Sequence, residues 1–204
     1  MIIGIDLNDV LRSFSGRMEE IYNKYEIGDE VDLKENPMTD FDLLTHFPFT
    51  GGLNELNHFL YIECSLEVFG LAPVTHEHIM MKLNTLNQNL NDEEEHRLII
   101  VSREANNSIP ASQFFLAKNA CKVDETKFYK KYEDLWERVD VLITANPLTL
   151  AAKPDNKISV KVETEYNTDE ASDYVLSTFE EFLEDEDVRT KILDSKNINI
   201  DDRN

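Results

Sequence analysis

Short apolar runs alternate with amphipathic segments along the chain. The runs are too short for typical helices, and they read as strands that are buried on both faces of a sheet. They lie at residues 2–5, 97–101, 139–143 and 157–162. The last of them alternates more than the others, so we expect it to lie nearer an edge of the sheet.

The segments between these runs carry apolar side chains at helical spacing. Helices are predicted over residues 13–26, about 75–90, from about 110 onwards, and 174–183. Strands that alternate with helices favour a parallel sheet built from βαβ units. We therefore predict an α/β protein with a three-layer, Rossmann-like parallel sheet.

The region between the first two apolar runs is long and mostly helical. Residues 27–48 are irregular, with a short helix expected near 40–46, and a further helical stretch covers about 51–71. The predicted organisation is an α/β core of residues 1–12 and 93–183, with a helical cap of residues 13–92 inserted after the first strand.

The last segment, residues 184–204, is strongly acidic and then polar. Such a composition favours a flexible tail. An ordered tail would indicate packing against a neighbour, either within a larger assembly or in a crystal.

Polar residues follow the first apolar run directly. Asp6 and Asn8 come after residues 2–5, and ligands of open α/β sheets bind just beyond the carboxyl ends of strands. We therefore expect Asp6 and Asn8 to project toward any site of chemistry. Two structural alternatives remain: Asp6 caps the next helix, and Ser102, which ends the second run, serves as a turn residue.

These residues resemble conserved motifs of the haloacid dehalogenase superfamily. Asp6-x-Asn8 after an apolar strand resembles its first motif, Asp-x-Asp-x-Thr/Val, with Asn8 in place of the second aspartate. Ser102 stands where the second motif has a phosphate-binding Ser or Thr. In this superfamily a lysine normally precedes the fourth motif, and Lys130 or Lys131 could fill that place. We take Lys131 as the candidate phosphate ligand.

The later part of the chain extends the resemblance to one branch. Residues 140–147 (DVLITANP) resemble the DVLIDDxP stretch of 5′(3′)-deoxyribonucleotidases, with Thr144 and Ala145 in place of two acids. The segments 165–167 and 174–183 resemble the closing part of that branch, and the helical block lies where these enzymes carry a cap. The resemblance implies a haloacid dehalogenase-like fold.

The departures from the motifs bear on activity. In this family the first aspartate is the nucleophile, the second transfers protons, and Mg²⁺ is held by the first aspartate and the fourth-motif acid. Asn8 cannot transfer a proton, and Thr144 and Ala145 bring no charge to a metal. These three substitutions predict a protein that is not an enzyme and that has no cofactor and no metal site.

Three functions follow from this interpretation. The favoured prediction is an inactive deoxyribonucleotidase-like protein that binds protein partners as a structural or interaction component of a larger assembly, such as a phage virion or connector. The second is a Mg²⁺-dependent phosphatase of nucleotides or small phosphate esters. The third is a nucleotide or phosphate sensor that retains Asp6, Ser102 and a lysine without catalysis.

Composition further limits the partners and the cellular location that we expect. With 41 acidic and 20 basic residues, the net charge of −21 argues against direct binding to nucleic acid, although it suits solubility or a basic partner. No apolar run reaches the length of a membrane span, and no secretory signal opens the chain. Cys64 and Cys121 are expected to be free thiols. We expect a cytoplasmic or virion-associated protein that is not secreted.

Overall fold

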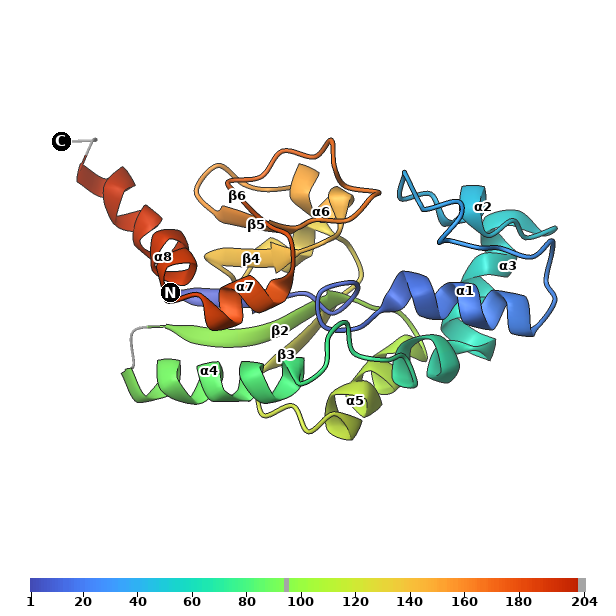
Figure 1. Ribbon diagram of the computed structural model, residues 1–204, viewed down its shortest axis with the longest axis horizontal. Coiled ribbons are helices and arrows are strands. Elements are labelled where there is room, and N and C mark those ends of the chain that lie inside the picture. The colour runs from blue at the N-terminus through green and yellow to red at the C-terminus, as the bar shows by residue number, and fades with distance from the viewer. Residues whose placement is uncertain (94–95, 202–204) are drawn as a thin grey trace.

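Six parallel strands form a single sheet in the computed structural model, which describes residues 1–93 and 96–201 (Figure 1). The strand order is β3-β2-β1-β4-β5-β6, and every neighbouring pair is parallel. The predicted α/β fold with a parallel sheet is confirmed. The strands are β1 (Ile2–Ile5), β2 (Arg97–Arg103), β3 (Thr126–Tyr129), β4 (Val141–Thr144), β5 (Ile158–Val162) and β6 (Tyr174–Leu176).

Helices and shorter helical turns occupy most of the connections between the strands. Two π-helical turns lie in the long connection between β1 and β2, and a 3₁₀ turn precedes β4. The elements are α1 (Phe14–Lys24), α2 (Leu43–His46), α3 (Gly52–His58), η1 (Phe59–Glu63), η2 (Leu66–Gly70), α4 (Ile79–Glu93), α5 (Ser108–Lys118), η3 (Glu133–Trp136), α6 (Pro147–Ala151), α7 (Phe179–Glu184) and α8 (Glu186–Asp201).

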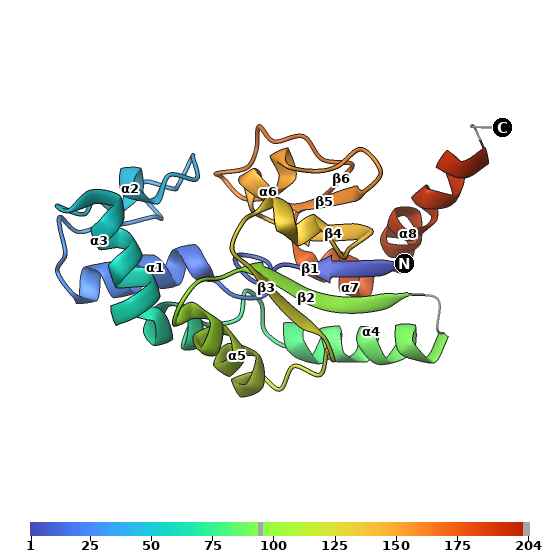
Figure 2. The ribbon, with the colours of Figure 1, turned by 180° about the vertical axis from the view of Figure 1, so that it is seen from behind.

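The side chains of the central strands alternate between the two faces of the sheet, and both faces are buried in apolar clusters. Ile3, Ile5 and Ile100 belong to the larger apolar cluster, which includes residues of α4 and α7. Ile99 and Leu142 belong to a second cluster on the other face, with residues of η3. Figure 2 shows the sheet from behind, with the strands running toward the cap.

Gly4 allows β1 to lie close to its neighbours. A Cβ atom at this position would lie 2.6 Å from Cγ1 of Val139 and 3.1 Å from Leu142 and Val101 side-chain atoms. A larger residue would therefore force the second apolar cluster apart. The single glycine in the apolar run thus has a packing function.

The cap lies beyond the carboxyl ends of the strands. It contains α1, α2, α3, η1 and η2 (Figure 1). Its interior is aromatic: the ring of Tyr22 lies 5.5 Å from the rings of Phe47 and Phe49, and Phe49 lies 5.3 Å from Phe59. These aromatic contacts pack the interior of the cap, which is continuous with the larger apolar cluster of the sheet.

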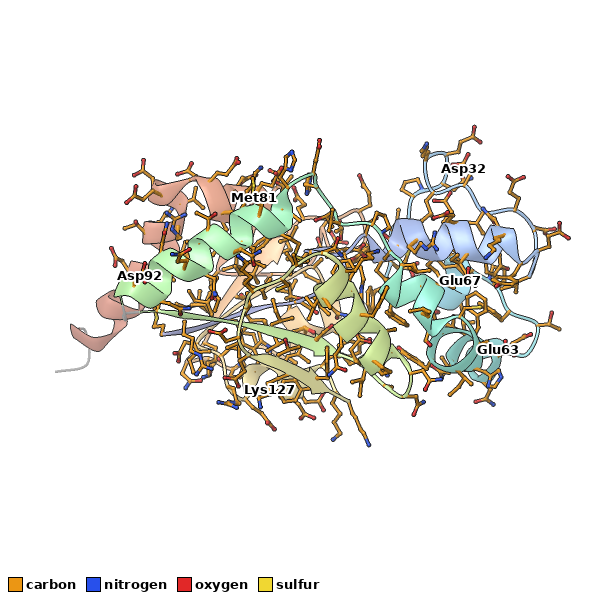
Figure 3. The ribbon with its side chains drawn as sticks, turned by 90° about the horizontal axis from the view of Figure 1, so that it is seen from below. Asp32, Glu63, Glu67, Met81, Asp92 and Lys127 are labelled. Carbon is orange, nitrogen blue, oxygen red and sulfur yellow. The ribbon has the colours of Figure 1, made fainter. Side chains whose placement is uncertain are left out.

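The position of α4 differs from the predicted domain boundary. The sequence interpretation placed residues 13–92 in the cap, but α4 packs against β2 and α7 on one face of the sheet. Figure 3 shows the helix that carries Met81 and Asp92 lying along the sheet, away from the cap residues Asp32 and Glu63. Helical periodicity alone cannot distinguish these locations.

Two further elements differ from the prediction. Residues 174–183 were expected to form one helix, but they divide into the edge strand β6 and helix α7. A capping box at Thr178 and Glu181 begins α7. Strand β3 was not predicted, and β5 lies one strand from the edge as expected.

The tail forms a helix instead of a flexible segment. Helix α8 packs against α7, and Ile192 and Leu193 are buried in the main apolar cluster. Contacts within this chain therefore hold the start of α8 through Ile192 and Leu193, and residues 202–204 lie outside the described residues. Among the described residues, no helix is long and apolar enough to span a membrane. Cys64 and Cys121 are both free cysteines.

Candidate active site

Asp6 lies where the strand order changes direction. It follows β1 at the centre of the sheet, with β2 on one side and β4 on the other. Ser102 ends the buried part of β2, and Thr144 ends β4, so both hydroxyls flank the Asp6 carboxylate. This is the crevice in which open α/β sheets bind ligands.

The Asp6 carboxylate is buried, with 4% of the residue exposed. Its Oδ1 accepts hydrogen bonds from the Leu7 backbone N–H at 2.7 Å and from Ser102 Oγ at 3.0 Å. Its Oδ2 accepts one from Thr144 Oγ1 at 2.8 Å. Burial raises the pKa of Asp6 to about 6, against the opposing effect of these hydrogen bonds. The carboxylate is therefore mostly ionised at neutral pH and fixed in orientation, as a nucleophile requires.

Asn8 has a fixed orientation because Arg12 binds its carbonyl oxygen. Oδ1 of Asn8 accepts hydrogen bonds from Nη2 of Arg12 at 2.6 Å and from Nε at 2.9 Å. Since both bonds occupy the oxygen, the Asn8 amide nitrogen is the group that remains for the cavity. Asn8 offers hydrogen-bond donors there, but no acid or base.

Arg12 belongs to a fully buried ion pair. Its Nη2 lies 2.8 Å from Oε1 of Glu104, and neither side chain is exposed. Nη1 of Arg12 donates to Ser112 Oγ at 2.7 Å and to the Phe69 carbonyl at 3.2 Å. The guanidinium is therefore held at once by Glu104 directly after β2, by η2 and by α5.

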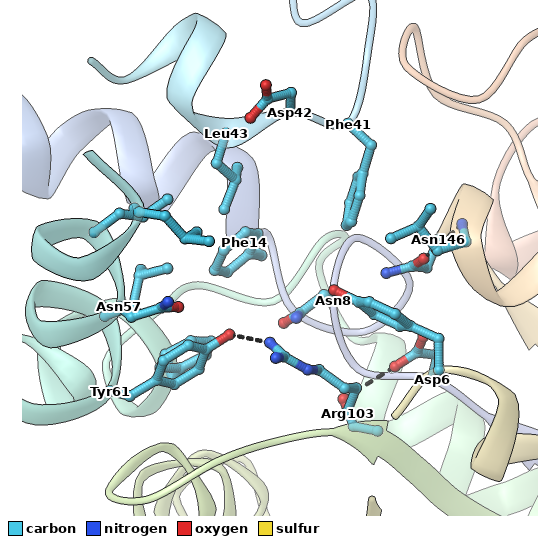
Figure 4. Close-up of a pocket in the computed structure, with 17 residues that line it drawn as sticks. Asp6, Asn8, Phe14, Phe41, Asp42, Leu43, Asn57, Tyr61, Arg103 and Asn146 are labelled. Atoms are coloured by element: carbon cyan, nitrogen blue, oxygen red, sulfur yellow. Dashed lines mark hydrogen bonds between the residues drawn. The ribbon is translucent and has the colours of Figure 1, made fainter. Parts of the chain in front are cut away.

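A cavity of about 290 Å³ opens over Asp6, between the sheet and the cap (Figure 4). The core supplies most of its polar residues, and the cap supplies apolar and aromatic ones. This size suits a small substrate. The lining residues are Asp6, Asn8, Phe14, Phe41, Asp42, Leu43, Leu53, Leu56, Asn57, Leu60, Tyr61, Phe69, Ser102, Arg103, Tyr132, Asn146 and Leu148.

Arg103 lies in this cavity with no carboxylate partner among the described residues. Its Nη1 donates a hydrogen bond to the hydroxyl of Tyr61 (Figure 4). The guanidinium carbon lies 5.4 Å from the Tyr61 ring centroid and 5.3 Å from that of Tyr132. The sequence interpretation missed Arg103, although its place directly after Ser102 was a usable signal.

The predicted lysine lies elsewhere. Lys131 is 69% exposed and its Nζ lies 3.9 Å from Glu133, and Lys130 is exposed as well. Neither residue lines the cavity. A role of Lys131 as a phosphate ligand stays a prediction, and Arg103 is the cation that the structure places beside Asp6.

Thr144 and Ala145 stand where the family has its metal-binding acids. Thr144 binds Asp6 instead, and the Ala145 carbonyl accepts a hydrogen bond from Asn167 at 2.8 Å. The next residue, Asn146, lines the cavity, and its Oδ1 accepts from the Leu148 and Thr149 N–H groups at the start of α6.

The residues present do not fit the Mg²⁺ ion that the resemblance implies. In the described part of the chain, no three His, Cys, Asp or Glu side chains gather in a way that could hold a metal. Asp9 caps the start of α1, where its Oδ1 accepts from the Phe14 N–H at 2.8 Å, and its Oδ2 accepts from Tyr166 at 2.9 Å. Mg²⁺ prefers several hard anionic oxygens, and Asp6 alone does not supply them.

No family model matches the sequence, and a search of curated proteins found no match. Solved structures do match almost the whole chain. One from Burkholderia xenovorans LB400, described as a haloacid dehalogenase-like hydrolase, has 10% identity and a TM-score of 0.58 over 92% of this chain and 96% of that one. The chain has the haloacid dehalogenase fold.

Two further structures agree with this fold. CbbY from Rhodobacter sphaeroides, in complex with phosphate, has 15% identity and a TM-score of 0.56 over 89% of this chain and 95% of that one. A dehalogenase described with an intermediate complex has 11% identity and a TM-score of 0.54, over 89% and 94% of the two chains. The superfamily resemblance is supported at the level of fold, whereas the deoxyribonucleotidase branch stays a prediction.

The comparison corrects the prediction that the chain is not an enzyme. The matching structures include proteins described as a hydrolase and a dehalogenase, and the matches cover cap and core alike. These descriptions contradict the prediction that was drawn from the missing acids. A role in a larger assembly or a phage particle stays a prediction.

Proposed function

We propose that the protein is a hydrolase that uses Asp6 to displace a halide from a short halogenated carboxylic acid. The observation that carries the proposal is the Asp6 carboxylate, which is buried at the base of the cavity, ionised at neutral pH and oriented by three hydrogen bonds. Such a group is a nucleophile held ready for attack on a bound substrate.

The choice of leaving group follows from the groups around Asp6. Displacement of an alkoxide needs an acid, and general acid–base catalysis contributes about 10²–10⁴ in rate. Asn8 stands where such an acid would act and cannot supply a proton. A halide departs as a stable anion and needs no protonation, so it suits this set of residues. Two of the matching structures are described as a dehalogenase and a dehalogenase-like hydrolase.

The reaction has two balanced steps. An oxygen of Asp6 attacks the carbon that bears the halogen, the C–O bond forms, and the halide leaves with the electron pair of the broken bond. Water then hydrolyses the ester on Asp6, which releases the hydroxy acid and one proton to solvent and restores the carboxylate. The Arg103 guanidinium is the cation in the cavity that can bind the substrate carboxylate.

The test is halide release from 2-chloropropionate and 2-bromopropionate, measured by ion chromatography in the presence of EDTA. We expect release by the native protein and none by the Asp6→Asn variant, because the amide is not a nucleophile. Asp32→Asn, which removes one negative charge from a cap loop outside the cavity, is the matched control and should retain turnover. If no halide is released from chlorinated or brominated acids of two to four carbons, the proposal fails.

A phosphate monoester is the second candidate substrate. Ser102 at the place of the second motif favours it, and CbbY in complex with phosphate has the same fold. The test is hydrolysis of p-nitrophenyl phosphate and a nucleotide panel with and without Mg²⁺. Hydrolysis that requires Mg²⁺ and is lost in Asp6→Asn would favour this candidate over halide displacement.

A further inference from the structure

Asn8 has one amide nitrogen that is open to the cavity. Its Nδ2 has no hydrogen-bond partner among the described residues. This nitrogen is also not among the unpaired polar atoms that are buried in the described part of the chain, so it is accessible. Asn8 itself lines the cavity beside Asp6 (Figure 4). The N–H groups of Asn8 therefore face the space in which a substrate would bind.

This orientation is imposed by Arg12. An asparagine side chain can turn about its last bond and exchange its oxygen and nitrogen at little cost. Here Nε and Nη2 of Arg12 both donate to Oδ1, at 2.9 and 2.6 Å. The reversed amide would place its N–H groups against a guanidinium that has no acceptor, so only one orientation is compatible with Arg12.

Arg12 is itself fixed from several sides. Glu104 and Ser112 bind its terminal nitrogens, and its guanidinium carbon lies 4.9 Å from the Phe69 ring centroid and 5.5 Å from that of Phe115. Because Arg12 is held on these sides, it fixes the orientation of the Asn8 amide, to which it donates two hydrogen bonds. Its charge, however, is already matched by Glu104.

We propose that Asn8 forms a seat for the departing anion and that Arg12 is the positioning residue that turns the Asn8 donors toward it. Negative charge moves from Asp6 to the leaving atom during the displacement. Preoriented donors beside Asp6 stabilise that charge without any rearrangement. This inference rests on the proposed function for its kinetic part, whereas anion binding by Asn8 does not depend on turnover.

The kinetic test compares variants that remove the amide donor of Asn8 with a variant that leaves Asn8 in place but weakens the hydrogen bonds that orient its amide. Asn8→Asp and Asn8→Ala should lower kcat for 2-bromopropionate by about 10²-fold, the usual effect of one such donor, with KM little changed. Arg12→Lys should lower kcat by a smaller factor, because it frees the Asn8 amide to turn. Asn36→Asp, which adds the same charge on an exposed cap loop, is the matched control and should keep kcat.

A comparison with Glu104→Gln separates positioning from stability. This variant removes the charge partner of Arg12 but leaves both Arg12–Asn8 hydrogen bonds, so it should lower the melting temperature while kcat of the folded protein persists. An equal loss of kcat in Arg12→Lys and Glu104→Gln would overturn the role of Arg12. A native kcat in Asn8→Asp would overturn the role of Asn8, even if the proposed function stands.

Bromide binding gives a readout that is independent of turnover. Bromide, titrated at constant ionic strength, should raise the melting temperature of the native protein and of Asp6→Asn, and should have no such effect on Asn8→Asp. If the native protein releases no halide but shows Asn8-dependent bromide binding, the anion seat stands and the proposed function fails. Bromide stabilisation that is equal in Asn8→Asp and the native protein would overturn the seat.

Discussion

Asp6 is buried, and hydrogen bonds from its neighbours oppose the effect of burial on its pKa. Removal from water favours the neutral acid, while the hydroxyls of Thr144 and Ser102 and the Leu7 N–H favour the carboxylate. The balance leaves a pKa of about 6, so the Asp6 carboxylate is ionised at neutral pH with a moderate energetic penalty. The same balance predicts that both the proposed activity and the stability depend on pH.

Turnover should rise with pH through the titration of Asp6. We expect the acid limb of the pH–rate profile near pH 6, since only the carboxylate attacks. Thr144→Val removes the hydrogen bond that lowers the pKa most, so its acid limb should move to higher pH. Thr149→Val removes a buried hydroxyl that has no partner among the described residues and should leave the limb in place. An unmoved limb in Thr144→Val would contradict this account.

Asp6 should lower stability at neutral pH. Its pKa in the folded protein, about 6, exceeds the unfolded value of 3.8, so the folded state binds more protons between these values and loses stability as pH rises through them. Asp6→Asn should therefore raise the free energy of unfolding at pH 7 by up to about 3 kcal/mol. Urea unfolding at pH 7 and pH 4 measures this, and the gain should shrink toward pH 4.

The residues that carry the site were predictable only in part. Asp6, Asn8, Ser102 and Thr144 each follow an apolar strand, and the parallel topology brings them together. Arg103 and the tyrosines around it come from separate elements whose approach no local pattern encodes. The orientation of Asn8 likewise depends on Arg12, whose partner Glu104 lies 92 residues away in the chain.

At the level of elements, composition and periodicity identified the buried strands more reliably than the edges. β1, β2 and β4 contain continuous apolar runs, as central strands require, and β5 alternates, as expected for a strand nearer the edge. β3 is only partly buried, and β6 has three residues, so neither carries a strong pattern. Val175, Leu176, Phe179 and Phe182 fit helical spacing, which concealed β6, although the capping box at Thr178 marked the true start of α7.

Gly4→Ala should damage β1 more than its small size suggests. The added Cβ would lie 2.6 Å from Val139 Cγ1 within a packed cluster, and overpacking of this kind typically costs about 1–3 kcal/mol. Gly16→Ala is the matched control. Gly16 lies within α1, where an added Cβ would lie 3.2 Å from Oγ of Ser13, and alanine favours helices. Chemical denaturation of both variants measures the difference, and an equal effect would contradict the packing function of Gly4.

On the scale of the whole molecule, the Arg12–Glu104 pair joins the cap to the core. Arg12 contacts Phe69 of η2 and Ser112 of α5, while Glu104 directly follows β2. The pair thus lies where the cap meets the sheet, and its partner Asn8 lines the cavity. Removal of the pair should therefore weaken the packing of the cap against the core.

Breaking this pair should be costly, but removing both charges should not. Arg12→Met leaves Glu104 buried without its cation, so we expect a loss of about 3–5 kcal/mol in the free energy of unfolding. The double variant Arg12→Met/Glu104→Leu should recover much of this loss, because no unpaired charge remains. Urea denaturation of both single variants and the double variant measures the coupling. Additive losses would contradict a coupled pair.

The central place of β1 has a consequence for biosynthesis. The strand that ends at Asp6 is synthesised before both of its partners, because β2 and β4 begin 95 and 139 residues after the first residue of β1. Until they emerge, this apolar segment has no edge to join and is exposed to association with other nascent chains. The crevice around Asp6 is thus completed only once β4 has been synthesised, and until then the folding of this sheet depends on protection of the unfinished polypeptide from association.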